Sequence, residues 1–299
     1  MKHKQRNWNE LVNKMNDKKQ YEVLQRASLF LEKHLRESRV AELLLQHHLD
    51  IPRTAFFMNM REVIPDSIYE AFMEDVRKHA ETGVPIQHLM GYEEFYGRRF
   101  SVDKHVLIPR PETEELVQTV IKAVEKSSSD SIRIVDVGTG SGVIAITLAL
   151  ELENAEVLGI DISPEALEIA KKNATQLDAK VKFRQGDFLQ PLLDEKIKAD
   201  IIVSNPPYIA ETERDALSDT VKNYDPELAL FAEDNGLAAY KEIIKQAKDA
   251  LHPNGLLAFE IGHTQGTAIK QLVLERYPQS DVDIIEDINK KERIILAKI

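Results

Sequence analysis

Seven short runs of apolar and β-branched residues alternate with segments of helical periodicity after residue 131, and this alternation constrains the fold more than any other feature of the sequence. The runs are 132–137, 156–160, 181–184, 200–204, 256–261, 282–286 and 293–298. Strands that alternate with helices usually form a parallel sheet with helices on both faces. We therefore predict an α/β fold with a doubly wound, mainly parallel sheet.

The N-terminal region shows a different pattern. From Asn7 to Ala80, apolar residues recur at helical spacing without a strand-like run, which predicts a small helical domain. One predicted stripe consists of Val23, Leu24, Ala27, Leu31 and Leu35. The predicted helix caps are Ser38, Thr54 and Asp66 at N-termini and Gly83 at the last C-terminus.

Residues 84–111 join these two regions. Aromatic and β-branched residues here are interrupted by Gly91, Gly97, Pro109 and Pro111, which favours a β-hairpin or an extended connector. We predict three parts: a helical substrate-docking domain at 1–83, a connector at 84–111 and a catalytic domain at 112–299.

Composition excludes several classes of function. The chain has no cysteine, so it can form neither a disulfide nor a cysteine-ligated zinc site, and its nine histidines show no metal-ligand spacing. No metal is expected. No apolar run approaches the ~20 residues that span a bilayer, so we expect a soluble, cytoplasmic protein. The net charge is −11 and the first 83 residues are nearly neutral, which weighs against duplex nucleic acid as a partner.

The first strand of the sheet region ends in a glycine-rich turn. This turn consists of Gly138, Thr139, Gly140, Ser141 and Gly142, and an apolar helix follows it. Glycines let the backbone approach a ligand at a helix N-terminus. Val143 breaks the dinucleotide pattern GxGxxG, and the P-loop Lys-Ser/Thr pair is absent. The GxGxG spacing favours the cofactor loop of class I methyltransferases, with a ligand-free tight turn as the alternative.

Acidic and aromatic residues follow the next two strands. Asp161 ends the second strand, where a carboxylate can accept hydrogen bonds from ribose hydroxyls. Its alternative role is to begin the helix that Ser163 caps, with Pro164 in the first turn. Asp187 and Phe188 follow the third strand, where they could contact an adenine ring. A loop acid and a core phenylalanine explain these two residues equally well.

The fourth strand ends in Ser204-Asn205-Pro206-Pro207-Tyr208, the most specific motif of the chain. Two prolines donate no backbone hydrogen bond, so their carbonyl groups are free to accept. The Asn205 side-chain oxygen and the Pro206 carbonyl could each accept an N–H of a planar nitrogen and aim its lone pair at a methyl donor. Tyr208 could pack against a flat substrate group. The alternative is a proline-rich strand end without a role in binding.

These residues resemble the amide and amino methyltransferases marked by Asn/Asp-Pro-Pro-Tyr, which include DNA adenine-N6 and cytosine-N4 enzymes. The connector narrows the resemblance. The segments 85–89, 95–97 and 107–114, with Gly91, resemble the release-factor glutamine N5-methyltransferases, the HemK/PrmC family. This resemblance covers nearly the whole chain.

The resemblance implies methyl transfer from S-adenosylmethionine to the glutamine of the Gly-Gly-Gln motif of peptide-chain release factors. It implies cofactor contacts by Gly138 to Gly142, Asp161, Phe188 and Asn205, to which the strand pattern adds Asp187. It further implies that Asn205 to Tyr208 hold the glutamine. Phe95 could wall the glutamine pocket or only pack the connector. Arg110 and Thr113 could reach the methionine end of the cofactor or only pack the connector; the roles of Glu260 and His88 also stay open.

Three departures from the family pattern affect fine placement rather than the reaction. They are His88, Asp225 and Asn235, where the family more often has Tyr, Glu and an acidic residue, respectively. Two other functions compete: an amino methyltransferase of DNA or RNA, which would need to flip a base, and a non-catalytic cofactor-binding scaffold.

Overall fold

The computed structural model describes residues 18–125 and 131–299. The chain divides into two compact units, Met1–Met90 and Gly91–Ile299, and each is described by itself. The part of the predicted helical region from Asn7 to Asp17 lies outside the described residues. Within the described ranges, no helix is both long and apolar enough to cross a membrane.

The first unit is helical, as its apolar periodicity predicts. Its helices are α2 (Gln20–Lys33), α3 (Arg39–Leu49), α4 (Arg53–Met58), α5 (Asp66–Thr82) and α6 (Ile86–Met90). They enclose a core that includes Leu31, Leu44, Phe56 and Phe72, all fully buried. This unit therefore has a hydrophobic core of its own.

The ends of these helices correct several predicted details. Leu35 does not belong to the stripe of α2, because the helix ends at Lys33 and Leu35 is left-handed and exposed. Thr54 and Asp66 are not N-caps; extended prolines, Pro52 and Pro65, occupy those positions. Proline fixes φ near the helical value but cannot continue a preceding helix, so it sets the start. Ser38 holds the N-cap position without a side-chain cap bond, and Gly83 ends α5 with φ 75° as predicted.

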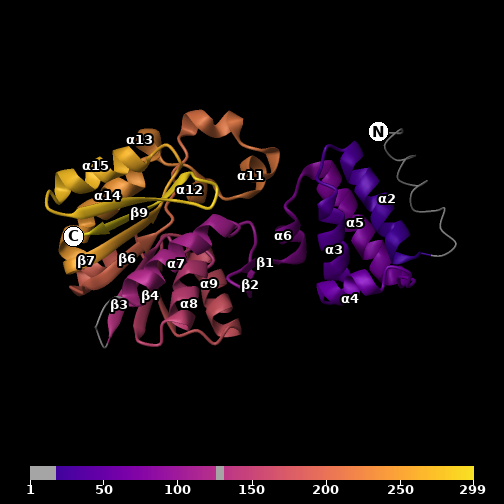
Figure 1. Cartoon of the computed structure of the whole chain (residues 1–299), viewed down its shortest axis with the longest axis horizontal. Coiled ribbons are helices and arrows are strands. Elements are labelled where there is room, and N and C mark those ends of the chain that lie inside the picture. Colours follow the sequence, from indigo (N-terminus) through magenta and orange to yellow (C-terminus); the bar gives the residue numbers. More distant parts are fainter. Residues whose placement is uncertain (1–17, 126–130) are drawn as a thin grey trace. The chain divides into compact units, whose positions relative to one another are not determined.

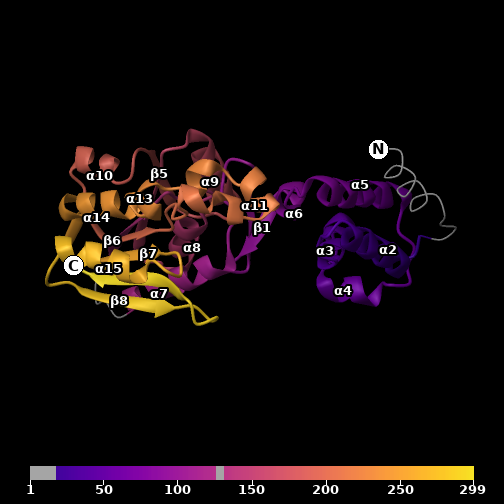
Figure 2. The same ribbon diagram turned by 90° about the horizontal axis from the view of Figure 1, so that it is seen from above.

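The second unit is built on a seven-stranded sheet. Its strands are β3 (Ile132–Val137), β4 (Ala155–Asp161), β5 (Val181–Gln185), β6 (Ala199–Ser204), β7 (Leu251–Glu260), β8 (Asp281–Glu286) and β9 (Glu292–Lys298). Their order is β5-β4-β3-β6-β7-β9-β8. The first five strands in this order pair in parallel, and β9 pairs antiparallel with both β7 and β8. Strand β8 therefore forms one edge of the sheet (Figure 2). The mainly parallel, doubly wound sheet is confirmed.

Helices cover both faces of this sheet (Figure 1). One layer contains α7 (Pro111–Glu125), α8 (Val143–Glu151) and α9 (Pro164–Gln176), and the other contains α10 (Gln190–Glu195), α14 (Ala238–Ala250) and α15 (Gly266–Arg276). Side chains alternate between the layers along each strand, as the period of two requires. In β3, Ile134 packs on the α7–α8 side and Val135 on the α14–α15 side. Asp136 follows them within this buried strand.

The predicted hairpin is present as β1 (Tyr92–Phe95) and β2 (Arg98–Ser101), which pair antiparallel around Tyr96 and Gly97. It is tied to the sheet unit by the buried Asn173 of α9. The Asn173 side chain accepts from the Ser101 N–H at 2.7 Å and donates to the carbonyl of Ser141 in the glycine turn at 2.9 Å. A single side chain thus connects the hairpin to the predicted cofactor loop.

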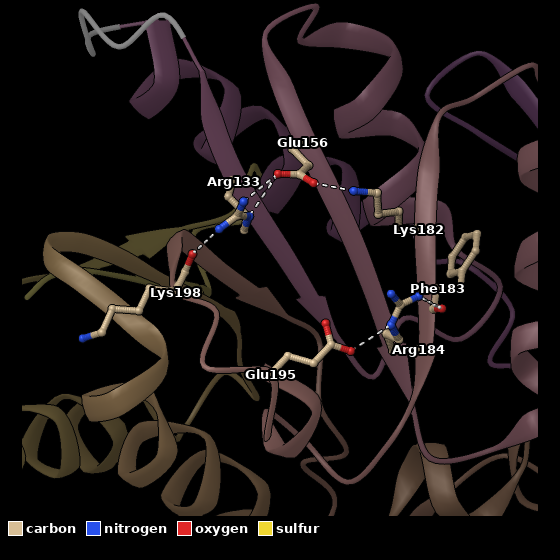
Figure 3. A network of polar contacts seen from close by, with 7 residues as sticks. All are labelled: Arg133, Glu156, Lys182, Phe183, Arg184, Glu195 and Lys198. Carbon is tan, nitrogen blue, oxygen red and sulfur yellow. Dashed lines mark hydrogen bonds and ion pairs between the residues drawn. The ribbon is translucent and has the colours of Figure 1, made fainter. Parts of the chain in front are cut away.

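Charged residues cross-link the amino-terminal ends of the strands, opposite the predicted ligand edge (Figure 3). Arg133 at the start of β3 bonds Glu156 at 2.8 Å, and Lys182 of β5 bonds the same carboxylate at 2.6 Å. These hydrogen bonds lower the pKa of Glu156. Because the groups are more than a third exposed, solvent screens the network and it contributes little to stability.

A long segment connects β6 to α14. It contains the short helices η1 (Glu211–Ala216), α11 (Asp219–Tyr224), α12 (Glu227–Leu230) and α13 (Glu233–Gly236). Ile209 and Phe231 form a bridge that closes its middle part. The segment starts at the Asn-Pro-Pro-Tyr motif, so its folding bears directly on the site.

Candidate functional site

A cavity of about 330 Å³ opens in the second unit at the carboxyl ends of β3, β4, β5 and β6. The strand order reverses beside β3, and open α/β sheets bind ligands at such switch points. Predicted site residues that line the cavity are Gly138, Thr139, Gly140, Ser141, Asp161, Asp187, Phe188, Asn205, Pro206 and Pro207. The fold therefore brings together residues from four separate strand ends.

The glycine turn presents open backbone to this cavity. Gly138 and Gly140 have φ +70° and +55°, a region that favours glycine, and a Cβ on Gly138 would meet no atom within 4 Å. Gly142 differs, since it does not line the cavity and its Cβ would lie 2.8 Å from Ile146. The first two glycines leave space for a ligand, whereas Gly142 permits the close start of α8.

Asp136, in the strand before this turn, holds the turn in place by hydrogen bonds. Its Oδ2 accepts the Thr139 hydroxyl at 2.6 Å and the Ala145 N–H at 3.2 Å, which links β3, the turn and α8. The side chain is fully buried. Burial raises the pKa of Asp136 to about 7, although these hydrogen bonds favour the ionised form.

We expect Asp136→Asn to remove part of the pH dependence of stability. A carboxyl whose pKa rises on folding, here from 3.8 to about 7, makes the folded state bind more protons in that window. Its stabilising contribution is complete below the unfolded pKa and is lost as pH rises through the folded pKa. The full loss is about 4 kcal/mol at ~1.36 kcal/mol per pKa unit. Thermal midpoints at pH 5 and pH 8 should therefore differ less in Asp136→Asn than in the parent.

The exposed Asp283→Asn is the matched control and should keep the parental pH dependence. Burial also raises the pKa of Glu260, so the thermal midpoint of Asp136→Asn should still fall somewhat between pH 5 and pH 8. An Asp136→Asn variant whose midpoints shift with pH as much as those of the parent would contradict the assignment.

Asp161, at the end of β4, is largely buried and lines the cavity. Its Oδ2 accepts the Gly140 N–H at 2.8 Å and its Oδ1 accepts the Ser163 N–H at 2.9 Å. Burial raises the pKa of Asp161, and the hydrogen bonds from Ser163 and Gly140 oppose this effect. Each carboxylate oxygen has a second lone pair for a ligand hydroxyl. Ser163 caps α9 as predicted, with the Ala166 N–H bonded to its Oγ at 3.1 Å.

The strand end of β5 adds Asp187 and Phe188 to the cavity wall. Asp187 is exposed, and Phe188 is partly buried with φ 48°. Phe188 also packs against the core on the α14–α15 side of the sheet. Phe188 therefore both lines the cavity and packs against the hydrophobic core.

The Asn-Pro-Pro-Tyr motif is held in place on both sides. Before it, the Ser204 hydroxyl donates to the Val137 carbonyl at 2.6 Å, which joins β6 to β3. After it, Gln265 donates to the Tyr208 carbonyl at 3.0 Å. Gly236 packs so closely that a Cβ there would overlap the Tyr208 carbonyl oxygen. The motif therefore has little freedom to move.

A buried polar pair lies beside Asn205. The Thr113 hydroxyl donates to Glu260 Oε2 at 2.6 Å, and Asn205 Nδ2 donates to Thr113 Oγ1 at 3.3 Å. Glu260 is 2% exposed at the end of β7. Burial raises the pKa of Glu260 to about 7, while hydrogen bonds from Thr113 and Asn205 lower it.

Arg110 connects the segment before α7 to the long segment after β6. Its guanidinium lines the cavity and pairs with the buried Asp225 at 2.9 Å. Burial raises the pKa of Asp225, and the charge of Arg110 lowers it. Pro226, Leu228 and Ala229 extend the cavity wall next to this pair.

Several predicted residues lie away from the cavity. Phe95 is 1% exposed and packs against Phe100 in the core beside α7 and α8. The Tyr208 ring packs on the opposite core, where burial raises its pKa to about 12. Neither side chain lines the cavity, and His88 lies in α6 of the helical unit. The roles predicted for them stay predictions.

The sequence analysis missed three supporting residues. Asp136 lies two positions before the glycine turn and has no predicted role, although a buried acid before a glycine turn is a detectable signal. Asn173 lies in the last turn of α9 and Gln265 precedes α15, so neither has a local pattern that indicates its hydrogen bonds. In the described part of the chain, no cluster of three or more His, Cys, Asp or Glu could hold a metal.

Comparison with protein-family models gives two matches. A model described as a methyltransferase domain matches residues 128–291. A model described as a PrmC N-terminal domain matches residues 22–91. The first match lies within the second unit and the second match spans most of the first unit, with residues 92–127 between them.

Curated relatives match over nearly the full chain. A protein of Bacillus cereus named release factor glutamine methyltransferase is 43% identical over 280 residues, which is 93% of this chain and 99% of that protein. Proteins of the same name from Bacillus subtilis and Enterococcus faecalis are 43% and 41% identical, covering 93% and 94% of this chain and 97% and 99% of their own length.

Solved structures show the fold. The hMettl16 catalytic domain in complex with MAT2A 3′UTR hairpin 1 is similar with a TM-score of 0.51 and 19% identity, covering 81% of this chain and 84% of that chain. The same domain with hairpin 6 also gives a TM-score of 0.51, with 18% identity over 78% of this chain and 81% of that chain. At this identity the likeness bears on the fold alone.

Proposed function

Since this chain belongs to the release factor glutamine methyltransferase family, we propose that it transfers a methyl group from S-adenosylmethionine to the side-chain amide nitrogen of the glutamine in the Gly-Gly-Gln motif of release factors. The observation that carries this proposal is the position of Asn205 and Pro206 on the same cavity wall as the glycine turn. A methyl donor and a planar nitrogen could meet there.

The residues at the cavity fit the cofactor. The open backbone of Gly138 and Gly140 would accommodate its polar chain, and the Asp161 carboxylate would accept from the ribose hydroxyls. Asp187 and Phe188 line the same cavity, where Asp187 could contact the edge of an adenine ring and Phe188 could pack against its face. When bound, S-adenosylmethionine supplies a methyl group activated by a sulfonium.

We expect Asp161→Ala to weaken cofactor binding by ~1.5–3 kcal/mol, the range for hydrogen bonds to a charged group. The variant loses the acceptors for the ribose, and also the anchor of the Gly140 N–H. Titration calorimetry with S-adenosylmethionine measures the effect, with the exposed Asp283→Ala as control. Parental affinity in a folded Asp161→Ala protein would remove this residue from the cofactor site.

The chain's own residues orient the substrate nitrogen. An amide nitrogen is a weak nucleophile because its lone pair is delocalised into the carbonyl. The Asn205 side-chain oxygen and the Pro206 carbonyl would each accept one of its two N–H groups, which directs the lone pair at the methyl group. Fixed acceptors of this kind raise the rate by positioning and by stabilising the charge that develops.

The deciding experiment uses labelled S-adenosylmethionine and an intact release factor, followed by peptide mapping of the label. We expect the label on the glutamine of Gly-Gly-Gln, and none on a release factor with alanine at that position. Duplex DNA serves as a second substrate in the same assay. Label on adenine or cytosine, with none on the glutamine, would replace this proposal with a nucleic-acid methyltransferase.

We further propose that the helical unit docks the release factor. A single glutamine offers little surface for specific recognition, because specific interfaces bury roughly 800 Å² per partner. The helical unit has its own core and exposes Leu29, Phe57, Met58 and Val63. Exposed apolar side chains of this kind are common at protein interfaces.

We expect a chain that starts at Gly91, where the second unit begins, to bind cofactor as the full chain does. Its KM for intact release factor should rise about tenfold or more, which is ~1.4 kcal/mol of lost binding. A short Gly-Gly-Gln peptide provides the internal control, since both chains should methylate it with the same KM. An unchanged KM for the intact release factor would refute the docking role and leave the reaction untouched.

A further inference from the structure

The hydrogen bonds around Thr113 determine which way the Asn205 side chain faces. When Glu260 is ionised, it can only accept, so the single proton of the Thr113 hydroxyl is directed at Glu260 Oε2, 2.6 Å away. Its oxygen can then only accept a hydrogen bond from Asn205, 3.3 Å away. The amino end of the Asn205 amide must therefore point to Thr113, which leaves its oxygen for the cavity that Asn205 lines.

The opposite orientation is disfavoured by the same groups. With Glu260 ionised, it would place the Asn205 oxygen beside the Thr113 oxygen and near the Glu260 carboxylate, with only the single Thr113 proton to satisfy both acceptors. Glu260 is 2% exposed and Thr113 is 3% exposed, so water offers little compensation. An unsatisfied buried polar contact of this kind is costly.

Orientation matters because an amide has a donor end and an acceptor end of nearly the same shape. Only the acceptor end can hold an N–H of the nitrogen that is methylated. A flipped Asn205 would present N–H groups to the substrate N–H and repel it. The side chain must be fixed before the substrate arrives, since reorientation would cost rate at each turnover.

We propose that Thr113 and Glu260 are positioning residues, which hold the Asn205 amide with its oxygen toward the substrate nitrogen. The inference rests on the proposed function in that it needs a nitrogen substrate held by Asn205. It goes beyond that function by giving a role to two buried residues on other elements, Thr113 in α7 and Glu260 at the end of β7.

The test is a mutant cycle on the full chain, with kcat measured at saturating cofactor and release factor. Thr113→Val removes the hydroxyl at nearly constant volume, and we expect kcat to fall ~10-fold or more because the amide is no longer fixed. Thr113→Ser restores the hydroxyl and should recover kcat to within about threefold of the parent. Thr147→Val is the matched control: Thr147 is also buried, its hydroxyl has no hydrogen-bond partner among the residues that the structure describes, and it does not line the cavity. Its kcat should equal that of the parent.

The second arm distinguishes positioning from general structural support. In an Asn205→Ala background there is no amide to orient, so adding Thr113→Val should change kcat less than ~2-fold. Cofactor affinity from calorimetry separates any effect on cofactor binding. An equal fold loss in both backgrounds, or a Thr113→Val kcat within twofold of the parent, would overturn the inference.

The cycle also remains informative if the proposed substrate is wrong. If peptide mapping finds the label on another planar nitrogen, the proposed function fails, but the same four proteins can be compared on that substrate. Non-additive losses there would support the positioning role of Thr113. Additive losses on whichever substrate the parent methylates would refute it.

Discussion

Asn205→Ala should lower the turnover of the enzyme by about a hundredfold or more while S-adenosylmethionine stays largely bound. The substitution removes the side-chain oxygen that we propose accepts a substrate N–H, and this bond matters most in the transition state. Asn205 also lines the cavity, so a small loss of cofactor affinity is compatible with the mechanism. Steady-state kcat at saturating cofactor, together with calorimetry, measures the two effects separately.

Asn289→Ala provides the matched control, because Asn289 is exposed in the turn between β8 and β9. Its kcat should equal that of the parent. If Asn205→Ala also stayed within a few fold of the parent, orientation of the substrate by this side chain would be wrong. The Asn-Pro-Pro-Tyr motif would then act through its backbone carbonyls alone.

Gly236→Ala should reduce turnover by a similar factor, although Gly236 does not line the cavity. Its backbone has φ +81°, and a Cβ would overlap the Tyr208 carbonyl and lie 2.7 Å from Gln265 Nε2. The left-handed backbone alone costs roughly 1–2 kcal/mol with alanine. The overlap must in addition displace Tyr208, and with it the proposed hydrogen-bond acceptors of Asn205 and Pro206. A displacement of about 1 Å can lower the rate ~100-fold.

Gly97→Ala separates these two contributions. Gly97 has φ +72° in the hairpin turn, and a Cβ there would meet nothing within 4 Å. It therefore carries the backbone cost without the overlap. We expect both variants to lose thermal stability and only Gly236→Ala to lose kcat. Equal kcat values in the two variants would show that the contact with Tyr208 is not needed for catalysis.

The sheet could be predicted from the sequence because each strand is a local pattern. The predicted run 132–137 coincides with β3, and the other six overlap their strands with small shifts at the ends. The largest difference is at β7, which starts at Leu251 instead of residue 256. The register of β6 and β7 shifts between Ala199 and Ile201, so this early part pairs irregularly and shows no alternating pattern.

The cavity was predictable where one strand end supplies a short motif. Gly138 and Asn205 each follow a strand and Asp161 ends one, and parallel strands bring their carboxyl ends to one edge. Contacts between distant segments were not predictable. Thr113 and Glu260 are 147 positions apart, and no local pattern indicates that they share a hydrogen bond.

Side-chain direction is the other limit. Phe95 and Tyr208 lie in conspicuous motifs, yet their rings pack into opposite cores of the sheet unit. An aromatic ring beside a ligand site and one beneath it give the same sequence signal, because both are apolar and partly buried. The sequence therefore indicates the segment that forms the wall more reliably than the side chains that face the cavity.

The position of β9 has a consequence for how the protein is made. β9 inserts between β7 and β8, and its Ile294 pairs with Glu260, so the strand that pairs with the end of β7 follows it in the chain by more than thirty positions. During synthesis on the ribosome, one edge of β7 stays unpaired until residues 292–298 have been added. The helical unit precedes the sheet unit in the chain and can fold much earlier. An unpaired apolar edge promotes aggregation. Nascent chains of this protein should therefore depend on chaperones most in the interval between the synthesis of β7 and of β9.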